Sequence, residues 1–175
     1  MKKRLLLALP AVLMMGCVAH QTTGPSASAV LEPRSGSSAR GRATFVELAD
    51  GSVRVTLDAT GVPAGQRGFH VHQVGDCSAA DASSAGPHFD TGGNPHGAPN
   101  QPPHHSGDFG NVTASASNRI QHEFVTRSIT VSPGPSSVVG RAVIIHGGTD
   151  DLTSQPAGDA GARIACGVVS LDNDM

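Results

Sequence analysis

The sequence predicts one all-β domain, a sandwich or barrel of short strands joined by turns and by two long loops. Short runs in which apolar and polar side chains alternate indicate strands that are buried on one face. The chain contains 22 Gly and 12 Pro, many of them between these runs, as is typical of turns. No stretch of useful length shows the periodicity of an amphipathic helix. Many short strands with Gly- and Pro-rich turns favour a sandwich or barrel.

The first expected strands form a hairpin. Residues 44–48 and 53–58 alternate between the two faces of a strand, and Asp50-Gly51-Ser52 between them is typical of a tight turn. Further strand-like runs follow at 69–72, 112–115, 121–129, 142–146 and 165–171.

Two connections are unusually long for a compact domain. Residues 73–110 are rich in Gly, Pro, Asn and Ser and carry several His. Residues 147–164 are also Gly-rich and contain Asp150, Asp151 and Arg163. Loops of this length are usually functional or disordered, and metal ligands together with a disulfide could order them. We therefore expect two functional loops.

The N-terminus has the features of an export signal. Positively charged residues 2–4 precede an apolar run at 5–15, which is too short to span a membrane, and Gly16-Cys17 closes it. A small residue followed by Cys resembles the lipobox of bacterial lipoproteins, in which the Cys is lipidated. Cleavage near Ala19, which would discard Cys17, is the alternative. We favour the lipoprotein, because no better cleavage site precedes Cys17, and expect an anchor on the periplasmic side of the bacterial cell envelope.

These features divide the chain into three parts. Residues 1–17 are the expected signal with its lipobox-like end, 18–40 a flexible tether rich in Ser, Ala, Gly and Pro, and 41–175 the domain. Without its signal the chain keeps 9 Arg, no Lys and 14 Asp and Glu, a formal charge of −5. Because nucleic-acid binding needs a basic surface, this balance argues against a nucleic-acid partner.

The cysteines predict one disulfide. If Cys17 carries lipid, Cys77 and Cys166 remain, and an exported protein with two such cysteines usually pairs them. The bond would close a loop of about 90 residues, worth roughly 4 to 5 kcal/mol in the chain-entropy model. Two buried free thiols are the alternative, which an oxidising compartment disfavours.

The segment Gly68-Phe69-His70-Val71-His72 predicts a metal site. Residues i and i+2 of a strand share one face, so His70 and His72 should project side by side. Two neighbouring imidazoles can chelate one transition metal, and a nitrogen-rich set with one carboxylate suits copper or zinc. Further candidate ligands are His88, His96, His104, His105, Asp108 and His146.

An ordered set of motifs over residues 41–175 resembles the copper/zinc superoxide dismutases, and the signal and tether resemble their bacterial periplasmic lipoprotein members. The resemblance implies a Greek-key β-sandwich or flattened barrel of about eight antiparallel strands. The motifs are Gly68–His72, Ser84–Phe89, His96-Gly97, His105–Asp108, Gly140-Arg141 leading to His146, Asp150–Leu152 and Gly161–Gly167.

The resemblance also implies two metal sites that share one ligand. His88 would bridge the metals, and spacing selects His105 over His104, which is expected to be a solvated loop residue. His20 lies in the expected tether, and His122 lies in a strand with no ligand-like neighbours. Copper would take His70, His72, His88 and His146, and zinc would take His88, His96, His105 and Asp108.

Two further residues would support the metals. Asp150 would link His70 to His96 through their free N–H groups, which fixes the orientation of both rings. Arg163 would attract and orient a small anion near the copper. The activity implied is the disproportionation of superoxide to O₂ and H₂O₂ by a redox-cycling copper beside a structural zinc, an antioxidant oxidoreductase reaction.

The chain departs from this family where Gly147, Gly148 and Thr149 follow His146, since many members carry Glu and Lys there. Steering of superoxide would then rest on Arg163, with Arg67 or Arg141 as further candidates. The competing function is a periplasmic metal reservoir or a silent relative. Loss of a ligand or of Arg163 would favour that reading, and none is lost. The sequence leaves open whether the chain forms a homodimer.

Overall fold

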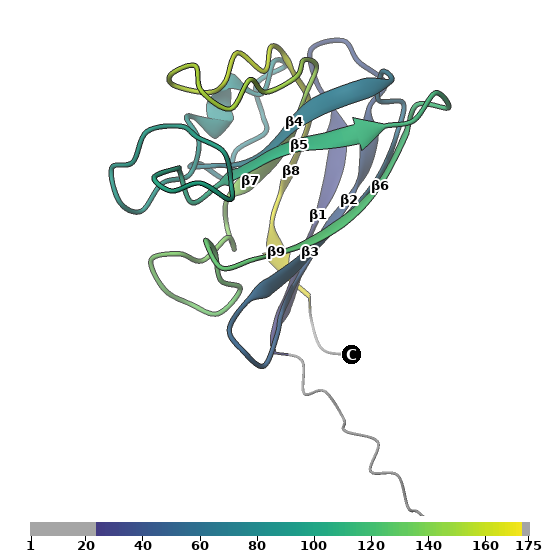
Figure 1. The fold of residues 1–175 in the computed structure, drawn as a ribbon. Helices are drawn as coiled ribbons and strands as arrows, with labels where there is room; N and C mark the ends of the chain where they lie inside the picture. The colour runs from purple at the N-terminus through teal and green to yellow at the C-terminus, as the bar shows by residue number, and fades with distance from the viewer. Residues whose placement is uncertain (1–23, 173–175) are drawn as a thin grey trace, which may run out of the picture.

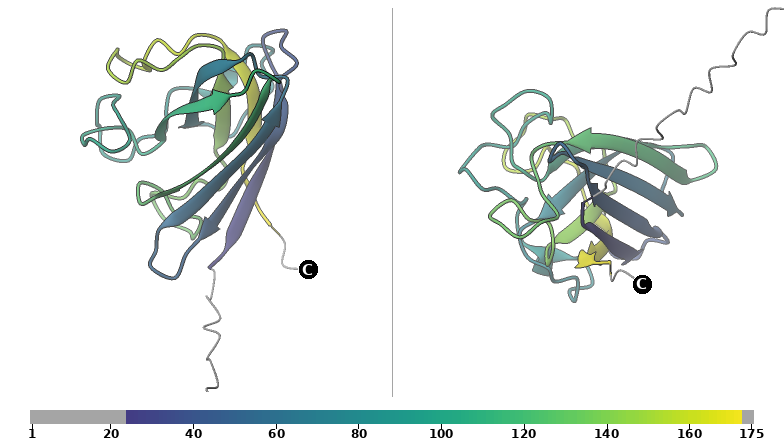
Figure 2. Two further views of the ribbon diagram at one scale, coloured as in Figure 1. Left: turned by 45° about the vertical axis from the view of Figure 1, so that its right-hand side comes forward. Right: turned by 90° about the horizontal axis from the view of Figure 1, so that it is seen from below.

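Two antiparallel layers of strands enclose the core in the computed structural model, which describes residues 24–172 (Figures 1 and 2). One layer holds β1, β2, β3 and β6, and the other holds β5, β4, β7 and β8, with β1 pairing to β8 where the layers meet. The strands are β1 (Ser26–Pro33), β2 (Arg40–Glu47), β3 (Val53–Thr60), β4 (Gly65–His72), β5 (Asp108–Ala114), β6 (Arg119–Thr126), β7 (Ala142–His146), β8 (Arg163–Val168) and β9 (Ser170–Leu171).

This arrangement confirms the all-β prediction. Eight strands follow one another in a hydrogen-bonded path, and the short β9 pairs with β1 outside it. The chain crosses between layers after β3, β5 and β6, which is the connectivity of a Greek-key sandwich. Within the described residues the only helix is a single 3₁₀ turn, η1 (Ser83–Ala85). No helix of residues 24–172 is long and apolar enough to cross a membrane.

Side-chain alternation builds the core. Along β3, Val53, Val55 and Leu57 are buried and the residues between them face outward. β2 pairs with β3 as the expected hairpin, and Asp50 in its turn accepts a hydrogen bond from the Ser52 backbone at 3.1 Å. The expected strand at 121–129 ends at residue 126, and the one at 165–171 divides into β8 and β9.

The expected tether at 18–40 is wrong for residues 26–33, which form β1, and for residue 40, which begins β2, so the folded domain starts before the expected residue 41. Ala27, Ala29 and Leu31 are buried on one face of this strand, and β1 pairs with β2 over six residues. Small Ser and Ala side chains are typical of linkers, but here their two-residue period lets β1 lie in the sheet with its Ala side chains against the core. Cys17 and the expected export signal lie outside the described residues.

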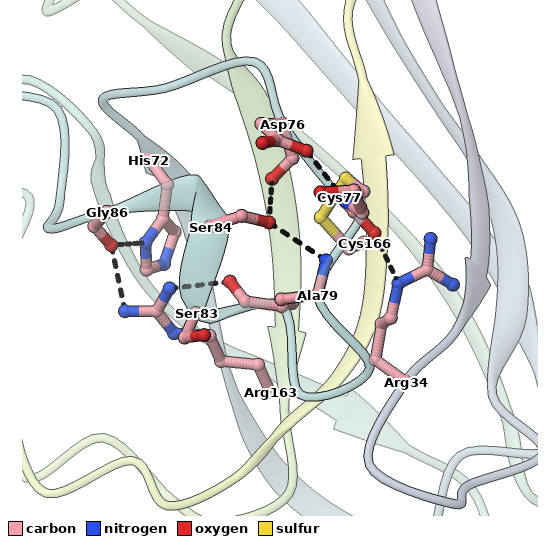
Figure 3. The surroundings of a disulfide bond; sticks show 12 residues. Arg34, His72, Asp76, Cys77, Ala79, Ser83, Ser84, Gly86, Arg163 and Cys166 are labelled. Atoms are coloured by element: carbon pink, nitrogen blue, oxygen red, sulfur yellow. Dashed lines mark hydrogen bonds between the residues drawn. A yellow bond between two sulfur atoms is a disulfide. The ribbon is translucent and has the colours of Figure 1, made fainter.

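Both long loops emerge on the same side of the molecule, beside β4, β5 and β7 (Figure 1). Residues 73–107 connect β4 to β5, and residues 147–162 connect β7 to β8. A disulfide joins Cys77, in the first loop, to Cys166 of β8, which is the pairing that the sequence predicts (Figure 3). Arg34, just after β1, donates a hydrogen bond to the Cys77 carbonyl at 2.9 Å. The first loop is thereby attached to the sheet at the disulfide.

Candidate metal centre

The strand β4 has two different faces. Phe69 and Val71 point into the apolar core, while His70 and His72 point to the opposite face. That face is not exposed, because the long loops cover it and both histidines are 0 % accessible. The two-residue period of the strand thus separates a core face from a histidine face.

His88 and His146 join the two histidines of β4 in a first cluster. His146 ends β7, the neighbour of β4, and His88 forms an isolated backbone bridge with His72. The His88 ring centroid lies 4.1 Å from that of His70 and 4.8 Å from that of His72. One ring nitrogen from each of the four residues lies within 4.8 Å of the others. The cluster is compact enough for one metal ion to contact all four.

Hydrogen bonds decide which ring nitrogens of this cluster remain free. His72 Nδ1 lies 2.9 Å from the Gly86 carbonyl, and His146 Nδ1 lies 3.2 Å from the Gly161 carbonyl. A ring nitrogen facing a carbonyl must be the protonated donor, so Nε2 of each ring carries the lone pair. His72 Nε2 and His146 Nε2 face each other at 3.4 Å.

Among residues 24–172, two buried side-chain nitrogens have no hydrogen-bond partner, namely His70 Nδ1 and His88 Nε2. Buried polar atoms are normally paired, and each exception requires an explanation. Together with the two Nε2 atoms of His72 and His146 they form a set of four nitrogen donors, which suits copper. The residues of the first cluster therefore fit a copper ion.

A second cluster surrounds Asp108 and consists of three histidines and this carboxylate. The Nδ1 atoms of His88, His96 and His105 lie 2.8, 3.0 and 3.3 Å from Asp108 Oδ1. Asp108 Oδ2 accepts the backbone N–H groups of Gly97 and His105 at 3.1 and 2.9 Å. Three nitrogens and one oxygen with no open position are what a structural zinc site requires. His88 belongs to both clusters and turns one ring nitrogen toward each.

Protonation states also favour metal binding. Burial lowers the pKa values of His70 and His72 well below their usual range and that of His146 to about 4. Burial alone would raise the pKa of Asp108, but its hydrogen bond and charge interaction with His88 lower it well below normal. Neutral imidazoles and an ionised carboxylate are the forms that bind metals.

One carboxylate connects the two clusters from outside. Asp150 Oδ2 lies 2.8 Å from His70 Nε2, and Oδ1 lies 2.9 Å from His96 Nε2. All three side chains are 0 % accessible. Because Asp150 occupies the Nε2 atoms, the Nδ1 atoms of His70 and His96 point into their clusters.

Sequence reasoning missed two residues beside Asp150, one that binds its backbone and one that leaves room for its carboxylate. Asn111 of β5 donates to the Asp150 carbonyl and accepts from its N–H group, both at 2.8 Å. Gly158 lies so close that a Cβ there would stand 1.9 Å from Asp150 Oδ1. Gly158 also has a φ of +66°, which favours glycine. Neither residue carries a sequence signal, since both contacts form only in the folded chain.

Arg163 begins β8, and the first long loop binds its guanidinium (Figure 3). Nη1 donates to the Ala82 carbonyl and Nη2 to the Gly86 carbonyl, each at 2.8 Å. The Gly86 carbonyl is also the partner of His72 Nδ1. A single carbonyl oxygen therefore lies between Arg163 and a histidine of the first cluster.

The other candidates lie outside both clusters. His104 is half-buried rather than solvated, with Nδ1 2.7 Å from the His105 carbonyl, and His122 is exposed on β6. Asp151 accepts hydrogen bonds from the Thr153 and Ser154 backbone and shapes a turn.

The other two arginines that the sequence offers for steering an anion, Arg67 and Arg141, contact nearby loops and the core. Arg67 donates to three carbonyls of the loop before and at the start of β4, those of Pro63, Ala64 and Gln66. Arg141 lies over the Phe89 ring, 3.5 Å from its centroid.

Comparison with known proteins decides the family. The model of the copper/zinc superoxide dismutases matches residues 39–169, which span both clusters, the disulfide and most of the fold. The chain belongs to the copper/zinc superoxide dismutase family. Members of this family bind copper and zinc and are superoxide dismutases, in agreement with the two donor sets. A crystal structure of the clock protein EA4 is similar over 86% of this chain and 97% of that one, with 39% sequence identity and a TM-score of 0.77.

Proposed function

We propose that this dismutase converts superoxide to O₂ and H₂O₂ with copper in the first cluster and zinc in the second. Copper would be held by His70, His72, His88 and His146, and zinc by His88, His96, His105 and Asp108. The single observation that carries the assignment is that the His88 ring turns one nitrogen toward each cluster. Its Nδ1 lies 2.8 Å from Asp108, while its buried Nε2 has no partner and belongs to the other donor set.

When bound, copper supplies the one-electron redox chemistry of the reaction and zinc holds its ligands in place. The chain contributes proton handling at His88. Because Asp108 and the zinc site engage Nδ1, Nε2 is the atom of this ring that could hold and release a proton, whenever its lone pair is not donated to the metal. The reaction consumes protons to make H₂O₂, so a proton store at the site serves it directly.

Arg163 guides the anionic substrate. Its guanidinium shares the Gly86 carbonyl with His72, so a positive charge is fixed beside the copper cluster. The mature chain has a formal charge of −5 and no Lys, which makes a local cation more important for attracting superoxide. Arg67 donates to carbonyls around the start of β4, and Arg141 donates to the Ser137 and Gln73 carbonyls. Only Arg163 of these three shares a hydrogen-bond partner with a copper-cluster histidine among the described residues, so we assign this role to Arg163.

A direct measurement of superoxide decay tests the function. The protein is purified, loaded with copper and zinc, and mixed with superoxide under stopped flow, with the metal content measured in parallel. We expect catalytic decay and a visible spectrum that differs from that of adventitiously bound copper. A metal reservoir would bind both metals in stoichiometric amounts without accelerating the decay, and that result would contradict the enzymatic function.

We also propose that the enzyme is exported and attached to a membrane of the bacterial envelope through lipid on Cys17. The charged residues 2–4, the apolar run 5–15 and Gly16-Cys17 support this proposal. The disulfide supports an oxidising compartment. Whether two copies associate is answered by measuring the mass of the purified protein in solution.

A further inference from the structure

Gln155, in the loop between β7 and β8, binds the backbone of His96 with both ends of its side-chain amide. The His96 N–H donates to Gln155 Oε1 at 2.9 Å, and Gln155 Nε2 donates to the His96 carbonyl at 2.9 Å. Nε2 also lies 3.2 Å from the Thr153 carbonyl. We propose that Gln155 is a positioning residue for the zinc site, an inference that rests on the metal assignment above.

The backbone of His96 depends on this amide. His96 lies in an irregular part of the first long loop, outside any strand or helix. Within residues 24–172, no main-chain group forms a hydrogen bond with its N–H or carbonyl group. A peptide group without a partner leaves the direction of the adjoining Cα–Cβ bond free to vary. Gln155 supplies a partner for each of these two groups. It therefore fixes the backbone orientation at His96 and, with it, the direction of the His96 Cα–Cβ bond.

The His96 ring is restricted from the same loop. Asp150 Oδ1 lies 2.9 Å from His96 Nε2, five residues before Gln155 in the chain. One loop therefore controls the backbone of His96 through Gln155 and its ring through Asp150. With both ends restricted, Nδ1 is directed at Asp108, 3.0 Å away. Such preorganisation lowers the cost of ordering a ligand when the metal binds.

The effect should fall on zinc rather than on copper. His96 belongs to the second cluster only, whereas the four residues of the copper cluster make no hydrogen bond to Gln155. Asp150 contacts a residue of each cluster, so substitutions there would not separate the two metals. Gln155 therefore offers a selective test.

Three variants dissect the contact. Gln155→Met keeps a side chain of similar length and removes both hydrogen bonds. Gln155→Glu retains an acceptor for the His96 N–H but cannot donate to the carbonyl. Gln121→Met is the matched control, because Gln121 is an exposed residue of β6 whose side chain has one described contact, to Asp58 at 3.5 Å.

Zinc affinity of the metal-free full-length protein is measured by competition with a chromogenic chelator, and copper affinity is measured separately. Co²⁺ bound in place of zinc reports the ligand geometry through its visible absorption, and thermal unfolding of the metal-free protein reports stability.

We expect Gln155→Met to lower the zinc affinity by about tenfold. Changes of residues that support metal ligands typically lower the metal affinity by about 10- to 100-fold, and Gln155 should lie at the lower end because it is exposed to solvent. Gln155→Glu should fall between Gln155→Met and wild type. The Co²⁺ spectrum should change in Gln155→Met and not in Gln121→Met.

Three results would overturn the inference. Equal zinc affinities for Gln155→Met and Gln121→Met would show that the amide does not position His96. Equal losses of zinc affinity, copper affinity and thermal stability in Gln155→Met would show a merely structural contact. A wild-type protein that binds no zinc in this assay would contradict the zinc assignment itself, and the inference with it.

Discussion

Arg163 and His72 bind the same oxygen atom, the carbonyl of Gly86 (Figure 3). Arg163 lies on β8 three residues before Cys166, and the disulfide attaches Cys166 to the loop that contains Gly86. The guanidinium therefore cannot move independently of His72 without breaking two hydrogen bonds to this loop. A fixed charge near the copper cluster acts on every approaching anion, whereas a mobile one would be averaged by solvent.

Reversal of this charge should slow the enzyme more than its removal. We expect the superoxide reaction of Arg163→Ala to be about tenfold slower at low salt and that of Arg163→Glu slower still, because the carboxylate repels the substrate. The Debye length is about 8 Å near physiological ionic strength, so wild type should slow as salt increases and Arg163→Glu should slow less or accelerate. Copper and zinc contents serve as the control. If both variants match wild type at low salt, Arg163 does not guide the substrate.

Loss of the shared ring should affect both metals. His88→Ala removes one nitrogen donor from each cluster at once. We expect copper and zinc affinities to fall by more than about 100-fold, since changes outside the ligand set already cost up to that much. His122→Ala is the control, because His122 is exposed and outside both clusters. Full stoichiometry of both metals together with normal activity in His88→Ala would disprove a shared ligand.

Gly158 should tolerate no side chain. The Cβ of Gly158→Ala would stand 1.9 Å from Asp150 Oδ1 and 2.6 Å from His96 Nε2, so the hydrogen bond between these atoms must break. We expect the affinity of zinc to fall about 10- to 100-fold. Gly36→Ala is a matched control, because Gly36 has a φ of +71° with nothing within 4 Å of the added Cβ. Chelator competition measures both variants, and equal affinities would mean that the close contact at Gly158 is relieved without cost.

The metal-free protein should lose stability in mild acid. Folded His70, His72 and His146 have lowered pKa values, so below pH 6.5 the unfolded chain binds more protons than the folded one. The free energy of unfolding should therefore decrease as the pH falls from about 6.5 toward 4, and the lowered pKa of Asp108 acts in the same direction at lower pH. Urea unfolding of the metal-free protein between pH 4.5 and 7.5 measures this slope.

The variant His146→Gln tests the origin of this pH dependence of the unfolding free energy, because it removes one buried group that resists protonation. The pH dependence should be weaker in His146→Gln than in wild type. His122→Gln, at an exposed position, should leave it unchanged. A stability that is constant across this range in wild type would show that burial does not hold these histidines neutral.

Cys17→Ser tests the membrane anchor. Because lipidation requires the cysteine thiol, the variant should move from the membrane fraction to the soluble fraction while the metal sites remain active. Fractionation of cells with an immunoblot and an activity assay measures both. Continued membrane association of Cys17→Ser would contradict the lipoprotein proposal.

Features that depend on residues close together in the chain could be predicted from the sequence. The hairpin between β2 and β3 follows from alternation and a turn, and the common face of His70 and His72 follows from the two-residue period of a strand. The order of the motifs was enough to predict the family. Local composition misled at β1, where Ser and Ala indicated a tether, because the apolar surface of small side chains counts only once a neighbouring strand packs beside it.

The contacts that support the metal ligands could not be predicted, because they join residues far apart in the chain. Asn111 contacts Asp150 across 39 residues of chain, and Gln155 contacts His96 across 59. Amide side chains of this kind occur on any protein surface, so neither residue carries a signal in the sequence. The free nitrogens of His70 and His88 follow in turn from the hydrogen bonds that Asp150 and Asp108 make to the other sides of these rings. Which ring nitrogen of each histidine stays free therefore depends on hydrogen bonds that form only when the two loops meet over the histidine face of β4.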